Sequence, residues 1–191
     1  MKPKLILSVS LLTIIIILTT AGIHFVPKIH LPKQVIQSVT TTPGYYPVTK
    51  VVDGDTIEVN MDGHIEKIRL IGLDTPETKK PNSPIECFGV AASNYAHKMM
   101  DGQKVRLQAD PINTNRDRYG RLLRYVYLAD GRLVNAEMIK QGYGFAYLSF
   151  PFTKADEFRN LQRQARENEV GLWGNECTIS NQNGRYKTNP L

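Results

Sequence analysis

Apolar and polar residues alternate in five stretches of the chain, as they do along half-buried β-strands. These stretches are rich in Val, Thr and Ile, which favour extended structure. They are residues 46–52, 56–61, 65–73, 105–109 and 122–128. Asp62-Gly63 separates the second stretch from the third and is a strong signal for a tight hairpin turn. The pattern therefore predicts five short strands.

Three other segments show the apolar spacing of amphipathic helices. The first follows the third strand, and its apolar face consists of Phe88, Ala91, Ala92, Tyr95, Ala96 and Met99. The second covers 133–141 and stops at Gly142. The third begins at Thr153, with Asp156 as an approximate capping box, and ends at Gly171. This order of elements predicts an α+β fold, a five-stranded OB-fold Greek-key β-barrel with three helices.

The N-terminal end has a different pattern. Lys2 and Lys4 precede an apolar run over 5–26 that contains no Asp, Glu, Lys or Arg. About 20 apolar residues can span a bilayer, and positive charge ahead of them keeps the N-terminus in the cytoplasm. We therefore predict that 1–26 is a signal peptide, cut near Thr19-Thr20-Ala21, or alternatively a retained membrane anchor. In either case this segment meets the membrane during export, and the rest of the protein is secreted or extracellular.

Composition indicates one folded domain after this segment. Of the 191 residues, 41% are apolar and 22% are charged, which suits a chain with a buried core. Residues 27–45 are predicted to be a linker, 46–177 the domain, and 178–191 a loose polar tail. The net charge of the whole chain is +6, but residues 1–45 carry four lysines and no acid, so only +2 belongs to the remainder. Overall charge therefore does not by itself indicate a nucleic-acid partner.

Cys87 and Cys177 are the only cysteines. In an exported protein, two cysteines most simply form one disulfide, here between the start of the first helix and the C-terminal end. In the loop-entropy model such a long closed loop stabilises the fold by roughly 4–5 kcal/mol. Two free buried thiols are the alternative.

Charged residues gather in three segments beside predicted strands. In the first, Asp53 and Asp55 flank Gly54, which by itself is typical of a simple turn. An EF-hand loop is excluded there, because its twelfth position is His64 instead of a bidentate Glu. In the second segment, Arg69 lies inside an apolar strand, where a charge is costly unless it is paired or faces a polar cleft.

The second segment ends in Asp74-Thr75-Pro76-Glu77, and the third covers 117–121. Hard cations bind oxygen ligands, so Asp55 and Asp74 are suited to part of a metal site. A structural salt bridge between one of these carboxylates and an arginine is the alternative. The third segment combines arginines, which match phosphate oxygens, with a tyrosine, which can stack on a base. Taken alone, it is also consistent with a solvated charged turn.

Together the three segments resemble the staphylococcal nuclease (thermonuclease) family over residues 46–173. The matching motifs are Val-Asp-Gly-Asp-Thr at 52–56, Asp-Thr-Pro-Glu-Thr at 74–78 with Arg69 five residues before it, and Tyr-Gly-Arg at 119–121. Further matches are Glu86-Cys87-Phe88-Gly89, Ala91-Ala92-Ser93, Val134-Asn135, Gln141-Gly142 and Leu172-Trp173-Gly174. The family implies an OB-fold barrel, one Ca²⁺ ion, and hydrolysis of DNA and RNA that leaves 3′-phosphate ends.

The resemblance also implies a metal site and a catalytic group. Asp55, Asp74 and the backbone carbonyl of Thr75 would bind Ca²⁺, with Asp53 outside the direct ligands. Glu77 would orient or deprotonate the attacking water.

Phosphate and base contacts are implied as well. Arg69 and Arg121 would hold the scissile phosphate and stabilise its transition state, and Tyr119 and Tyr147 would line the nucleotide pocket. Ser149 stands where the family commonly has a second tyrosine, which changes the base-stacking surface.

Three alternatives remain: a non-catalytic binding barrel like that of Tudor-type relatives, a different metallonuclease, and an exported structural or adhesive domain. The non-catalytic relatives lose the acids and arginines, all of which are present here. The histidines form no zinc-like cluster; they are His24, His30, His64 and His97. We therefore predict a calcium-dependent endonuclease that acts on DNA and RNA as a monomer.

Overall fold

The structure is a computed structural model that describes residues 44–79 and 83–191. The predicted export segment 1–26 lies outside the described residues, as does the linker 27–45 apart from its end. Among the residues that are described, no helix is long and apolar enough to cross a membrane.

Five strands form a closed barrel. They are β1 (Tyr45–Asp53), β2 (Thr56–Met61), β3 (His64–Leu70), β5 (Lys104–Gln108) and β6 (Leu122–Tyr127). Their order around the barrel is β1-β2-β3-β6-β5, and β5 closes it by pairing with β1. The pairs are antiparallel except for β3 and β6, which are parallel. The predicted OB-fold barrel is thus confirmed.

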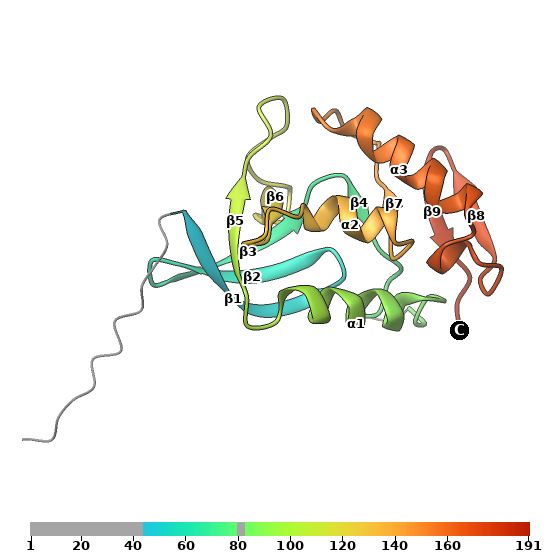
Figure 1. Cartoon of the computed structure of the whole chain (residues 1–191), viewed down its shortest axis with the longest axis horizontal. Coiled ribbons are helices and arrows are strands. Elements are labelled where there is room, and N and C mark those ends of the chain that lie inside the picture. The colour runs from blue at the N-terminus through green and yellow to red at the C-terminus, as the bar shows by residue number, and fades with distance from the viewer. Residues whose placement is uncertain (1–43, 80–82) are drawn as a thin grey trace, which may run out of the picture. The chain divides into compact units, whose positions relative to one another are not determined.

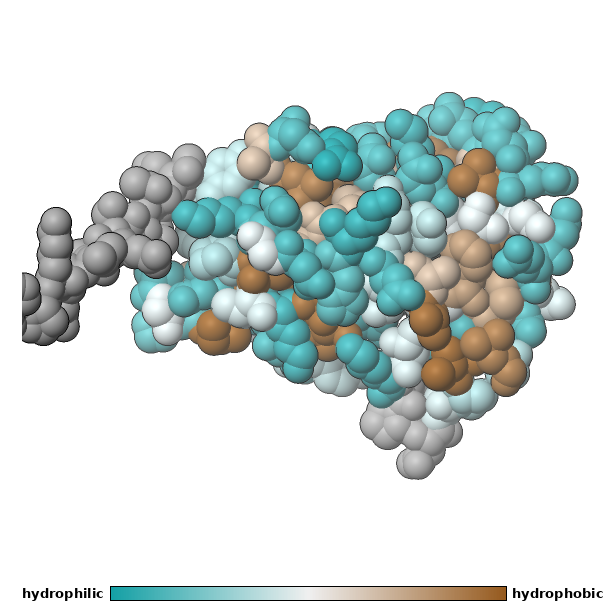
Figure 2. Space-filling model, turned by 60° about the horizontal axis from the view of Figure 1, so that its bottom comes forward, coloured by the Kyte–Doolittle hydropathy of each residue, from teal (hydrophilic) through white to brown (hydrophobic). Residues whose placement is uncertain are grey.

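Three α-helices accompany the barrel (Figure 1). They are α1 (Gly89–Met100), α2 (Val134–Lys140) and α3 (Ala155–Glu167). Helix α1 contacts β1, and α2 lies between β6 and α3. Most of their buried apolar residues join those of the strands in one core, whereas Ala165 of α3 belongs to a second cluster. On the face shown in Figure 2, hydrophilic side chains cover most of the surface and apolar ones gather in smaller groups between them.

Two small sheets complete the fold. Strand β4 (Leu73–Asp74) pairs with β7 (Phe145–Ala146), and β8 (Ile179–Gln182) pairs with β9 (Arg185–Thr188). A short 3₁₀ helix, η1 (Gly171–Trp173), precedes β8. Residues of these elements, among them Phe145 of β7 and Trp173 of η1, form a second apolar cluster, separate from the barrel core.

The predicted third strand is too long at its C-terminal end. Strand β3 stops at Leu70, and the chain turns at Gly72, whose φ is 70°. Leu73 and Asp74 then pair with β7 instead of continuing the barrel. The run 70–73 is apolar throughout because both sides of the turn are buried, so its periodicity contained no sign of the break.

The predicted capping box at Thr153 is also wrong. Helix α3 begins at Ala155, and no side chain caps its N-terminus. The hydroxyl and the backbone N–H of Thr153 instead both donate to Oδ2 of Asp110, at 2.6 and 2.7 Å. Thr153 is therefore bonded to the buried carboxylate of Asp110, far away in the sequence, instead of forming a capping box with Asp156.

The C-terminal segment differs from the loose tail that the sequence suggested. Residues 179–188 form the β8–β9 hairpin, with Asn183 and Gly184 at the turn in left-handed conformations, φ 53° and 84°. Asn-Gly is a favoured hairpin dipeptide, so this element had a local signal that the sequence analysis missed. A disulfide joins Cys87, which lies just before α1, to Cys177, which lies just before β8, and the predicted pairing is thus confirmed.

Candidate active site

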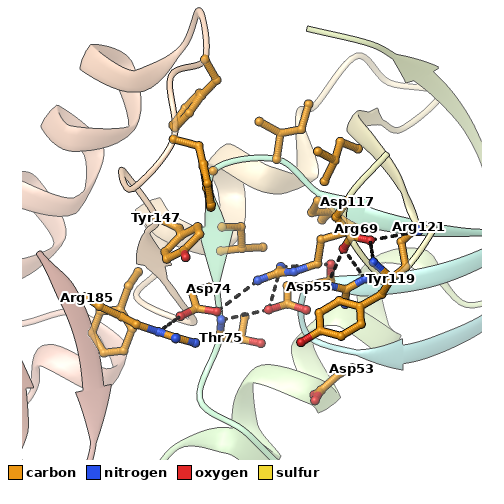
Figure 3. Close-up of a pocket in the computed structure, with 18 of the residues that line it drawn as sticks. Asp53, Asp55, Arg69, Asp74, Thr75, Asp117, Tyr119, Arg121, Tyr147 and Arg185 are labelled. Atoms are coloured by element: carbon orange, nitrogen blue, oxygen red, sulfur yellow. Dashed lines mark hydrogen bonds and ion pairs between the residues drawn. The ribbon is translucent and has the colours of Figure 1, made fainter. Parts of the chain in front are cut away.

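The centre of the site is an arginine held between two carboxylates (Figure 3). Nη1 of Arg69 lies 2.7 Å from Oδ2 of Asp55, and Nη2 lies 3.0 Å from Oδ1 of Asp74. The three side chains are only 13–20% exposed. The charge inside β3 is therefore paired, as burial requires.

Barrel register produces this arrangement. Thr56 pairs with Arg69 across β2 and β3, which places the preceding residue, Asp55, beside the guanidinium. Gly54 permits a close approach between two loops, since a Cβ at this position would lie 2.7 Å from the hydroxyl of Thr75. The backbone N–H of Thr75 in turn donates to Oδ2 of Asp55 at 3.3 Å. The first two charged segments of the sequence thus meet in space.

Asp53 lies outside this arginine-centred cluster. Its Oδ1 accepts hydrogen bonds from the N–H of Gly54 at 2.9 Å and from the hydroxyl of Thr78 at 3.1 Å. Burial, together with the nearby Asp55 and Glu77 carboxylates, raises the pKa of Asp53 to about 6.

Acidic groups are crowded at this end of the molecule. Burial raises the pKa of Asp74 to about 6, and the negative charges of Asp55 and Glu86 act in the same direction, against the opposing effect of Arg69. A cation would relieve this repulsion. The donors available are carboxylate and carbonyl oxygens, which hard divalent cations prefer. The residues present therefore fit such an ion.

Side chains alone do not complete a metal site here. Across 44–79 and 83–191, no group of three or more His, Cys, Asp or Glu side chains is arranged to hold a metal ion. A cation bound by Asp55 and Asp74 therefore needs backbone oxygen, such as the carbonyl of Thr75, and water as further ligands.

Glu77 is held in place by the loop that carries it. Its Oε1 accepts the backbone N–H groups of Thr78 at 3.0 Å and Lys79 at 2.9 Å. Its own N–H donates to Oε2 of Glu86 at 3.1 Å, a contact that the sequence analysis did not anticipate. The half-buried Glu77 lines the same cleft as Asp55 and Asp74.

Arg121 is bound by an acid of its own segment. Its Nε and Nη2 lie 2.7 and 2.6 Å from Oδ2 of Asp117. Burial would raise the pKa of Asp117, but the hydrogen bonds from Arg121 outweigh it and lower that pKa. Nη1 of Arg121 reaches the hydroxyl of Thr56 at 3.5 Å, and that hydroxyl donates to Asp55 at 2.9 Å. The third charged segment is thus linked to the Arg69 centre.

The two predicted tyrosines lie at different places on the cleft. Tyr119 is 68% exposed, and its ring centroid lies 5.4 Å from the guanidinium carbon of Arg121. Tyr147 follows β7, and its ring lies 5.9 Å from that of Phe150, which is 61% exposed. Phe150 supplies an aromatic surface near the position where Ser149 replaces a tyrosine. Phe150 was absent from the predicted site because it lies one residue beyond the motif position.

The predicted site residues border one cleft of about 1020 Å³. It receives Asp53, Asp55, Arg69, Asp74, Thr75 and Glu77 from the barrel side, and Tyr119, Arg121, Tyr147 and Phe150 from later loops. Neither His64 nor His97 is among its lining residues; His97 pairs with Asp101 on α1. Arg185 and Lys187 of β9 also line the cleft, although the sequence analysis placed them in the tail.

Comparison with known proteins agrees with the fold and the motifs. Residues 67–175, more than half of the chain, match the family model described as staphylococcal nuclease homologue. A thermonuclease from Staphylococcus intermedius is 42% identical over 132 residues, which cover 67% of this chain and 75% of that protein. A thermonuclease from Staphylococcus hyicus is 40% identical over 68% of this chain and 76% of its own length. Endonuclease YncB of Bacillus subtilis is 37% identical over 69% of this chain and 63% of its own length.

The fold, the order of the charged motifs and these comparisons therefore agree, and the chain belongs to the staphylococcal nuclease family and is a nuclease, that is, a hydrolase.

Proposed function

We propose that this nuclease is an exported, calcium-dependent endonuclease that hydrolyses phosphodiester bonds of DNA and RNA and leaves 3′-phosphate ends. The observation that carries the proposal is the linked network at the cleft, in which Asp55 and Asp74 hold Arg69 while Thr56 connects Asp55 to Arg121. Oxygen donors for a cation and two guanidiniums for a phosphate lie along one wall of the same cleft.

The metal part of the proposal rests on donor chemistry. Asp55, Asp74 and the carbonyl of Thr75 would hold Ca²⁺, and Asp53, bonded to Gly54 and Thr78, would act from outside the direct ligands. Bound there, the ion supplies positive charge beside the phosphate and so favours the more highly charged transition state. A site of this kind, with only two carboxylates and a partly solvated cleft, suits the millimolar calcium found outside cells.

The remaining groups act on the substrate directly. Arg69 and Arg121 carry planar forks that match phosphate oxygens and stabilise the charge that develops during attack. Glu77, fixed through Oε1, would use Oε2 to orient the attacking water or to accept its proton. Tyr119 and Tyr147 would stack on bases.

Export and assembly belong to the same proposal. The apolar run after Lys2 and Lys4 supports secretion or membrane anchoring with the nuclease domain outside. A protein of this kind needs only one chain to form the cleft, and we propose that it acts as a monomer.

The direct test is digestion of single-stranded DNA, duplex DNA and RNA by the purified protein in Ca²⁺, in Mg²⁺ and in EGTA, with identification of the product ends. We expect cleavage in Ca²⁺ that leaves 3′-phosphates and is abolished by EGTA. Cleavage that persists in EGTA would refute the calcium requirement.

Glu77→Ala separates catalysis from binding. Because general base assistance contributes about 10²–10⁴-fold, we expect kcat to fall by that order while oligonucleotide affinity changes little. Asp101→Ala is a matched control, since this exposed acid of the α1 C-cap pairs only with His97 among the described residues and lies outside the cleft. Unchanged digestion by Glu77→Ala would show that the catalytic assignment is wrong.

A further inference from the structure

The C-terminal hairpin brings a third arginine to the cleft. Arg185 is the first residue of β9, and its Nε lies 3.7 Å from Oδ2 of Asp74. Its guanidinium carbon lies 5.8 Å from the ring centroid of Tyr147. Figure 3 shows Arg185 beside Asp74 and Tyr147, on the opposite side of Asp74 from Arg69. The arginine therefore lies close both to a proposed metal ligand and to a proposed base-stacking ring.

The hairpin is docked firmly enough to position this side chain. Tyr186 stacks on Phe145, with 5.4 Å between ring centroids and 17° between planes, and meets Trp173 edge-on at 5.8 Å. The hydroxyl of Thr188 donates to the carbonyl of Cys87 at 2.8 Å, and the N–H of Cys87 donates to the carbonyl of Asn189 at 2.7 Å. These contacts anchor β9, and the disulfide holds the chain just before β8, so that an element that would be only marginally stable alone is fixed in place.

The charge of Arg185 is poorly neutralised by its own protein. Its distance to Asp74 is longer than a hydrogen bond, and its side chain is 55% exposed, whereas Arg69 makes two short pairs and is 15% exposed. Lys187 lies two residues further along β9, on the same face, and also lines the cleft. In the part of the chain that the structure describes, its ammonium group has no ion pair. Two cations at this end of the cleft are thus available to an anionic ligand.

We propose that Arg185 and Lys187 form a phosphate-binding subsite, which holds the nucleic-acid strand beside the hydrolytic centre while Tyr147 stacks on an adjacent base. The proposal rests on the proposed function of the cleft and extends it to a segment outside the family match, which ends at residue 175. Strand phosphates are the chemistry that this pair suits, because each exposed cation that meets a phosphate releases counterions and adds affinity. Arg185 is thus a substrate-binding residue and has no part in proton transfer.

The test measures binding without cleavage. The full-length protein is titrated with a fluorescent eight-residue thymidine oligonucleotide in EDTA, at several salt concentrations between 50 and 200 mM. Arg185→Gln should weaken binding roughly tenfold, since hydrogen bonds to charged groups are of that strength. It should also lower the slope of log affinity against log salt by about 0.7, the value for one phosphate contact on a single strand. Lys187→Gln should lower the slope by a similar amount, and Arg185→Lys should restore most of it.

Arg163→Gln is the matched control. Arg163 is 53% exposed, close to the 55% of Arg185, and it also pairs with a single acid, Glu167, but it lies on α3 outside the cleft. The same loss of charge there should change affinity less than twofold. If Arg163→Gln and Arg185→Gln weaken oligonucleotide binding equally, the effect comes from the overall charge of the protein, and the subsite proposal is overturned.

Two further results would also overturn it. Wild-type affinity and slope in Arg185→Gln would show that the arginine meets no phosphate. Tighter binding, or faster cleavage at limiting Ca²⁺, would show that Arg185 obstructs Asp74 instead of serving the substrate. Parallel digestion in Ca²⁺ separates the two proposals. Binding that depends on Arg185 without any cleavage refutes the proposed calcium-dependent endonuclease activity alone, and cleavage without that dependence refutes the subsite alone.

Discussion

Two regions of the molecule meet at the carboxylate of Asp74, and they hold their arginines differently. On the barrel side, Arg69 lies 3.0 Å from Oδ1 and is 15% exposed; on the hairpin side, Arg185 lies 3.7 Å from Oδ2 and is 55% exposed. A largely buried charge must be neutralised within the fold, whereas an exposed one gains little from its pair and stays available to a ligand. The difference indicates that the barrel centre is preorganised and that the hairpin is an added contact surface.

Arg69→Lys should have the largest effect. One ammonium cannot replace a planar fork that spans Asp55 and Asp74, so we expect kcat to fall on the order of 10³-fold. Steady-state digestion of DNA in Ca²⁺ measures the change. Arg106→Lys is the control, because Arg106 stacks on Tyr127 at 4.1 Å and does not line the cleft. Equal rates for Arg69→Lys and wild type would remove the distinction between a preorganised centre and an added surface.

Breaking the disulfide should affect the hairpin more than the barrel. The bond between Cys87 and Cys177 spans 90 residues, and we expect Cys87→Ser with Cys177→Ser to lower the free energy of unfolding by roughly 4 kcal/mol, at the lower end of the loop-entropy value. Denaturant titrations with and without reductant measure this loss, and the double variant should be insensitive to reductant. The kcat of the folded variant should remain near that of the wild type, because barrel register, not the disulfide, positions Arg69. If the denaturation midpoint of the wild-type protein is the same with and without reductant, the prediction is contradicted.

Low pH should reduce the stability of the barrel side and leave that of the C-terminal hairpin unchanged. Burial would raise the pKa of Asp110, but hydrogen bonds from Thr153, Tyr125 and Ile112 outweigh it and hold that pKa at about 2, against an ordinary 3.8. The folded pKa is the lower one, so the carboxylate stabilises the fold above about pH 4, and this stability is lost as the pH falls to about 2. The shift corresponds to roughly 2 kcal/mol. The hairpin residues 179–188 contain no acid and have no such dependence of their own.

Asp110→Asn tests this prediction. We expect it to lower the free energy of unfolding at neutral pH by roughly 2 kcal/mol and to flatten the dependence of stability on pH between 4 and 2. Asp130→Asn provides the comparison, since Asp130 is an exposed acid paired with Arg132 in a surface turn. If the free energy of unfolding of Asp110→Asn depends on pH between 4 and 2 as that of the wild type does, groups other than Asp110 cause the loss of stability in acid.

Tyr186→Leu should have the smallest effect. It keeps an apolar side chain but removes the stack on Phe145, which we expect to lower the free energy of unfolding by about 1 kcal/mol. Tyr45→Leu, at the start of β1 and away from this cluster, is the control. If the loss is confined to local hairpin opening, hydrogen exchange should accelerate in β8 and β9 while barrel amides stay protected. Acceleration throughout the barrel would contradict the separation of the two regions.

The prediction from the sequence was most accurate where the signal was local. Alternation and the Asp62-Gly63 turn predicted the meander, and the apolar stripe beginning near Phe88 predicted α1. It failed where a side chain bonds to a residue distant in the sequence instead of to a near one, as Thr153 does with Asp110. It also missed the Asn183-Gly184 turn, whose signal was present but lay in a polar segment judged too hydrophilic to pack.

By itself, the sequence determined the barrel, the order of the charged motifs and the residues from which a hydrolytic centre could be built. Only the tertiary structure decided that Arg69 bridges Asp55 and Asp74, and that Arg185 of the supposed tail enters the same cleft. The reason is physical. Strand periodicity and turn chemistry act between neighbours in the chain, whereas these contacts arise from barrel register and hairpin docking, which bring together residues far apart in sequence.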